Sequence, residues 1–90
     1  MDEKEAVLHA RLAMHEALLV NLWAELMLTS PDPEAATSIT MSAAMDDARK
    51  SWGNETSRSL APEVIPQLLR ETQNFWLKVQ MKVEERLQGP

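Results

Sequence analysis

The chain has 90 residues, a formal net charge of −5, no cysteine and only two glycines. A chain of this length encloses one small core at most, so we expect a single domain over residues 1–90. Its hydrophobic content of 44% excludes a disordered tail, and the lack of cysteine excludes a disulfide scaffold. Nucleic-acid binding is not expected, because phosphate contacts need clustered basic side chains and the nine lysines and arginines are scattered.

The chain shows no pattern typical of export or of membrane insertion. Its first residues, MDEKEAV, include three acids and one lysine, whereas a secretory signal has a basic start followed by an apolar core. The longest apolar run, ALLVNLWAELML, is interrupted by Asn21 and Glu25 and is far shorter than the roughly 20 residues that cross a bilayer. These patterns predict a cytoplasmic protein that does not associate with membranes.

The first predicted helix covers about residues 3–29 and has a regular apolar row. Spacings that alternate between four and three residues separate the members of this row, which we call the heptad stripe: Leu8, Leu12, His15, Leu19, Leu22 and Leu26. Such spacing keeps one row of a helix facing a partner helix. Other large apolar residues lie off the stripe, namely Val7, Met14, Leu18, Trp23 and Met27. The apolar surface is therefore wide, and we expect it to be covered on more than one side.

The second predicted helix covers about residues 33–52. Pro31 and Pro33 end the first helix, and Asp32 is placed to cap the second one, with Pro33 at its first position. Small residues dominate this segment and allow neighbouring helices to approach closely. Its larger members form a narrow row, which consists of Met41, Met45, Ala48 and Trp52.

The third predicted helix covers about residues 63–88 and follows a polar segment, GNETSRSLAPE, that we expect to be a linker. Its apolar row contains Ile65, Leu69, Thr72, Trp76, Val79, Val83 and Leu87. Pro62 and Pro66 cannot donate backbone hydrogen bonds, so the first turn is expected to be irregular or 3₁₀.

Short connections make consecutive helices antiparallel neighbours, so the predicted fold class is all-α, a three-helix antiparallel bundle. In this arrangement Trp76 lies near Trp23, whereas Trp52 lies at the far end of the second helix. The apolar faces of the first and third helices exceed what three helices can cover. We therefore expect the bundle to be completed by dimerisation.

The predicted function is association, as a small acidic protein–protein interaction or regulatory module. Its partner is expected to be a second copy of the chain, with a basic protein as another partner suited to the acidic surface. Neither enzymatic activity nor a cofactor is expected. The residues predicted to form the interface, with aromatic anchors dominating its energy, are Leu12, Leu19, Leu22, Trp23, Leu26, Leu69, Phe75, Trp76, Val79 and Val83.

An alternative hypothesis is a small-ligand-binding protein or minor enzyme centred on His15 and Asp47. In a hairpin about Asp32, residues equally far from the turn lie level, which brings His15 beside Asp46 and Asp47. A buried imidazole facing a carboxylate is an arrangement for proton transfer, although it also occurs as a purely structural pair. The sequence has no G-x-S-x-G motif and no phosphate-binding loop to strengthen the catalytic reading.

Metal binding is not expected either. Glu5, His9 and Glu16 share a face of the first helix, but His9 and His15 are about 240° apart around it and cannot share an ion within one chain. The sequence contains no H-E-x-x-H motif and no cysteine ligand. Glu5 and His9 are therefore interpreted as solvated surface residues.

Overall fold

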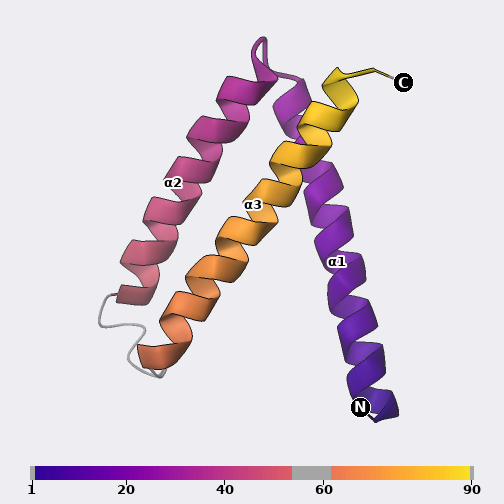
Figure 1. Ribbon diagram of the computed structural model, residues 1–90, viewed down its shortest axis with the longest axis vertical. Coiled ribbons are helices and arrows are strands. Elements are labelled where there is room, and N and C mark those ends of the chain that lie inside the picture. The colour runs from indigo at the N-terminus through magenta and orange to yellow at the C-terminus, as the bar shows by residue number, and fades with distance from the viewer. Residues whose placement is uncertain (1, 54–61, 90) are drawn as a thin grey trace.

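The computed structural model describes residues 2–53 and 62–89, which form three long helices (Figure 1). Helix α1 covers Glu3–Leu28, α2 covers Pro33–Gly53, and α3 covers Ile65–Leu87 after a short 3₁₀ turn, η2, at Pro62–Val64. The predicted all-α fold with three helices is confirmed, with bounds that differ from the expected ones by at most two residues. Residues 54–61 of the predicted linker lie outside the described residues.

The helix ends follow from local hydrogen bonding. The Asp2 carboxylate accepts a hydrogen bond from the backbone N–H of Glu5 at 2.7 Å, which satisfies a free donor in the first turn of α1. At the start of α2, the Asp32 carboxylate accepts from the N–H of Ala35 at 3.2 Å, as the sequence predicts. Gly89 follows α3 with φ of 100°, a backbone conformation that glycine adopts readily.

The predicted irregular start of the third helix is also confirmed. Pro62 and Pro66 flank the first turn of this segment, and the backbone forms the 3₁₀ turn η2 before it becomes α-helical at Ile65. Proline is tolerated here because the first N–H groups of a helix have no intrahelical acceptor. The 3₁₀ turn therefore precedes α3 at a place where proline breaks no intrahelical hydrogen bond.

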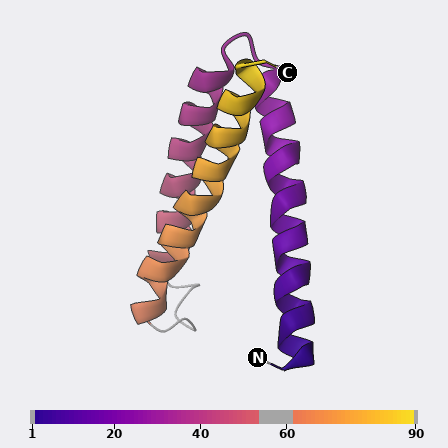
Figure 2. The same cartoon turned by 45° about the vertical axis from the view of Figure 1, so that its right-hand side comes forward.

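Helix α3 lies between the other two helices and packs against both (Figure 1). Helices α1 and α2 are antiparallel and are connected by a tight turn, from which they diverge. Helices α1 and α3 run in the same direction and come together only toward their C-terminal ends, as the turned view also shows (Figure 2). The result is a V whose arms are the N-terminal parts of α1 and α3.

The core lies where the three helices meet. Its buried apolar side chains are Val20, Ala24, Met27, Trp76, Val79 and Val83, and Met45 of α2 is buried outside this cluster. The three from α3 belong to the predicted apolar row of that helix, and Met45 belongs to the predicted row of α2. Thr37 is buried as well, and its hydroxyl donates a hydrogen bond to the Pro33 carbonyl at 2.7 Å, so it carries no unsatisfied polar group into the core.

Candidate functional site

The heptad stripe of α1 lies on the surface of the folded chain. Its five leucines have exposed fractions between 48% (Leu19) and 64% (Leu22), and His15 between them is exposed too. A single exposed leucine on a small protein is ordinary, but a continuous row of them is not. The stripe is therefore the main candidate for a functional surface.

The core of the chain uses another face of the same helix. Val20, Ala24 and Met27 are buried against α3, and their mean direction lies roughly 125° around α1 from the stripe at 100° per residue. Trp23 lies between these two faces and is half-buried. Helix α1 therefore has one apolar face that packs within the chain and a second that does not.

The N-terminal half of α1 extends away from the rest of the fold. Every described residue from Asp2 to His15 is exposed, and both ribbon views show this part of the helix standing apart from α2 and α3 (Figures 1 and 2). Isolated helices of this length are marginal in water, because most helical stability in proteins comes from packing an apolar face. The position of this half favours a neighbour that the single chain does not supply.

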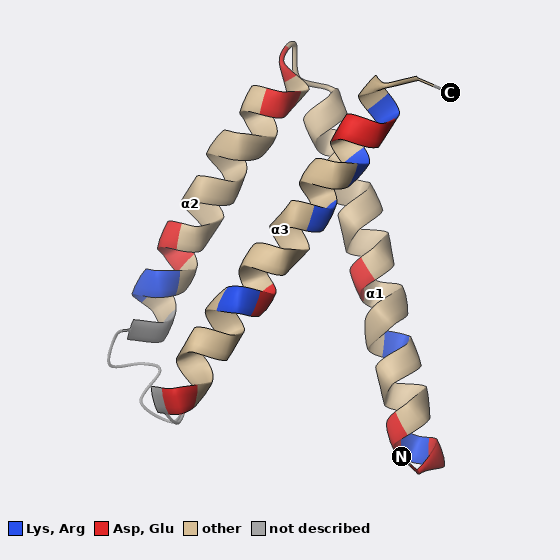
Figure 3. Ribbon diagram, viewed as in Figure 1, with Lys and Arg blue, Asp and Glu red and all other residues tan. Residues whose placement is uncertain are grey.

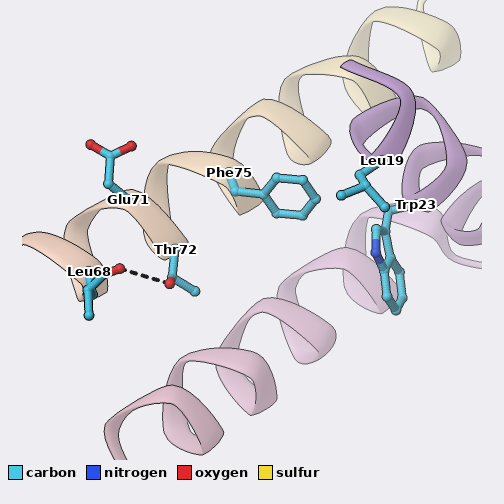
Figure 4. Close-up of a pocket in the computed structure, with 6 residues that line it drawn as sticks. All are labelled: Leu19, Trp23, Leu68, Glu71, Thr72 and Phe75. Atoms are coloured by element: carbon cyan, nitrogen blue, oxygen red, sulfur yellow. Dashed lines mark hydrogen bonds between the residues drawn. The ribbon is translucent and has the colours of Figure 1, made fainter. Parts of the chain in front are cut away.

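An open groove lies beside the stripe, where α1 and α3 begin to diverge. It has a volume of about 430 Å³ and is lined by Leu19, Trp23, Leu68, Glu71, Thr72 and Phe75. Figure 4 shows Phe75 pointing from α3 toward Leu19 of α1. The Thr72 hydroxyl donates to the Leu68 carbonyl at 2.8 Å, so its hydrogen is already used within α3. The groove is thus an apolar surface that continues the stripe through Leu19.

Two ion pairs join α1 to α3. Lys78 pairs with Glu16, and Arg86 pairs with Glu25, and all four side chains remain substantially exposed. Apart from these two glutamates, the part of α1 that follows Arg11 carries no formally charged side chain (Figure 3). Exposed pairs of this kind contribute little to stability, so the core contacts hold α3 against α1.

The structure divides the predicted interface residues into three groups. Leu12, Leu19, Leu22 and Leu26 are exposed on α1, while Trp23, Leu69 and Phe75 are half-buried. Trp76, Val79 and Val83 are 6%, 0% and 1% exposed, because α3 is the central helix and its apolar row faces inward. Their assignment to an interface between chains is therefore corrected, since these three side chains form the core of one chain.

His15 and Asp47 do not come together. Both residues are exposed, and among the hydrogen bonds and ion pairs of the described residues none joins them. The expected pairing assumed a closed hairpin, whereas α1 and α2 diverge from their turn because α3 lies between them (Figure 1). The geometry therefore gives the alternative hypothesis no assembled proton-transfer pair.

Sequence reasoning missed part of the groove. Leu68, Glu71 and Thr72 line it but were not among the predicted site residues. Leu68 and Phe75 are seven residues apart and lie beside the apolar row of α3, and Thr72 of that row lies between them. This signal could have identified the α3 wall of the groove.

In the part of the chain that the structure describes, no three histidine, aspartate or glutamate side chains are grouped as a metal site would require. Within the same residues, no helix is both long enough and apolar enough to span a membrane. Comparisons with protein families, with curated proteins and with solved structures gave no match to this chain. A functional assignment therefore rests on the physical properties of the stripe and the groove.

Proposed function

We propose that the chain is a protein–protein interaction module that forms a homodimer through the heptad stripe of α1. The observation that carries this proposal is the exposure of the whole stripe on a helix whose other apolar face is already buried. Leu12 and Leu22 are 57% and 64% exposed, although they occupy the positions that a coiled-coil seam buries.

The pattern of the stripe supports a helical partner. Alternating spacings of four and three match the repeat at which two helices keep contact along their length. From Leu8 to Leu26 the stripe extends about 27 Å at 1.5 Å per residue, which is long enough for a stable helix pair. A second copy of the chain carries a surface of the same spacing and length, so it fits the stripe without any further assumption.

The groove supports the same function better than it supports a small-ligand site. Its volume of about 430 Å³ falls within the range of ligand pockets, but those sites usually enclose most of their ligand. This groove is open along the direction in which α1 and α3 diverge. Its apolar wall is continuous with the stripe through Leu19, so one helical partner can cover both.

Replacement of Leu12 by glutamate tests the proposal. The Leu12 side chain is largely exposed in the single chain, so the L12E variant should fold normally. It should nevertheless remain monomeric, because dimerisation would bury the charge of the glutamate. The matched control is Ile39→Glu, since Ile39 is 70% exposed and lies on α2, outside the stripe. Light scattering across a dilution series should give a dimer for the wild type and for I39E. A wild type that stays monomeric, or an L12E variant that dimerises as the wild type does, would overturn the proposal.

A further inference from the structure

Building on the proposed self-association, we infer that the two α1 helices pair antiparallel, so that the N-terminal half of each fills the groove of the other copy. The proposal fixes the partner, its direction and its register. It rests on the spacing of the stripe, on the position of the groove and on the charges beside the stripe.

The spacing of the stripe is the same in both directions. Read from Leu8 to Leu26, or from Leu26 to Leu8, it is four, three, four, three and four residues. Two stripes can therefore meet antiparallel over their full length, with every member opposite another member. Leu8 then faces Leu26 of the second copy, Leu12 faces Leu22, and His15 faces Leu19.

The shape of the chain distinguishes this direction from a parallel one. Only the C-terminal half of α1 is covered by α3, while residues 2–15 are exposed. In an antiparallel pair, the exposed half of each α1 lies beside the covered half of the other, next to its groove. A parallel pair would place the two exposed halves together and leave both grooves open. It would also place His15 against His15 in one layer of the seam.

The charges on one side of the stripe agree with the antiparallel register. Arg11, Leu18 and Glu25 occupy this side at intervals of seven residues. The antiparallel arrangement brings Arg11 near Glu25 of the second copy, which is already paired with Arg86 of its own α3, and Leu18 near its own equivalent. Opposite charges at such flanking positions favour one pairing over others. Each dimer contains this pair of opposite charges twice.

The other side of the stripe faces the groove and carries His9, Glu16 and Trp23 at the same interval. Here the two Glu16 side chains approach each other near the symmetry axis, and each is already paired with Lys78 of its own α3. His9 of the second copy lies beside Trp23, at the wall of the groove. The second α1 thus runs antiparallel to both helices that line the groove, as neighbouring helices do in an up-down bundle.

Disulfide trapping tests the register, because the natural chain contains no cysteine. Leu8→Cys and Leu26→Cys chains, one of them with a size tag, are oxidised separately and as a mixture in a glutathione redox buffer. The expected result is a covalent mixed dimer from the mixture and little covalent dimer from either variant alone. Both leucines are about half exposed, so these substitutions leave the core intact. Leu12→Cys mixed with Leu22→Cys provides a second, independent pair, and Ile39→Cys is the control that should not cross-link.

The molecular mass of the reduced samples is measured in parallel by light scattering. This measurement tests self-association separately from the antiparallel register. If the samples are dimeric but the Leu8→Cys variant cross-links with itself, or neither cysteine pair cross-links, the antiparallel register is wrong. Self-association is still supported by either result. Samples that remain monomeric at every concentration overturn self-association itself. Mixed cross-links from both cysteine pairs, together with a dimeric mass, support both.

Discussion

The indole rings of Trp23 and Trp76 meet edge to face, with 5.0 Å between their centroids and 64° between their planes. This contact joins α1 to α3 close to the point at which the two helices diverge. Phe75 also packs edge to face against Trp76, with 5.3 Å between ring centroids. Aromatic pairs of this geometry are favourable beyond the area that they bury, so this cluster fixes the apex of the V.

Replacement of Trp76 by alanine should lower the free energy of unfolding by about 3 kcal/mol, because it leaves a large cavity at the apex. Urea denaturation at one fixed protein concentration, followed by far-ultraviolet circular dichroism, measures this change. The control is Leu77→Ala, one residue along α3 and 40% exposed, which should cost less than about 1 kcal/mol. Equal urea midpoints for the two variants would contradict the assignment of Trp76 to the core.

Replacement of Leu22 by alanine should weaken dimerisation about a hundredfold. Each copy loses part of the burial of one leucine, so a symmetric dimer loses about 3 kcal/mol in total. The monomer itself should be little affected, since Leu22 is 64% exposed there. Sedimentation equilibrium gives the dissociation constant, with Ile39→Ala as the variant expected to dimerise normally. A dissociation constant unchanged by L22A would place the interface elsewhere.

Replacement of His15 by leucine should strengthen dimerisation about tenfold or more. His15 is the polar member of the stripe, and a polar residue at a seam position reduces stability because its ring nitrogens lose contact with water. The same sedimentation experiment measures the gain. If H15L dimerised no more tightly than the wild type, His15 would lie outside the buried seam.

Replacement of Lys78 by glutamine should change the stability of the monomer by less than about 1 kcal/mol, because its pair with Glu16 is exposed to solvent. Dimerisation should weaken more clearly, since the two Glu16 side chains then face each other without their lysines. The double variant with Glu16→Gln should restore it. A double variant that dimerises as poorly as K78Q would show that the repulsion between the glutamates is not the cause.

The three helices could be predicted from the sequence, because the signals are local. The proline and aspartate residues around Asp32 set the start of α2, and the spacing along α3 identifies the apolar row that contains Trp76, Val79 and Val83, although this row forms the core and not the expected interface. The proximity of Trp23 and Trp76 also follows from counting residues along the helices. These predictions needed only helical periodicity and short connections.

The role of each apolar face could not be predicted in the same way. Helix α1 has two apolar rows, and α3 packs on the row that contains Val20, Ala24 and Met27 and not on the heptad stripe. Ala24 is fully buried there, because a small side chain allows the two helices to approach closely. The packing of α3 on this face of α1 places α3 between α1 and α2, and it thereby separates His15 from Asp47. Which apolar row of α1 enters the core depends on how the side chains of all three helices fit together. The residue spacing along one helix does not contain this information.

The most direct test of self-association is the mass of the wild-type chain in solution, measured by light scattering from high to low micromolar concentration. Self-association through the stripe predicts twice the 10.2 kDa of one chain at high concentration, with a reversible shift toward the single chain on dilution. A mass of 10.2 kDa at every concentration would contradict it, because the stripe of α1 would then remain exposed in the functional protein.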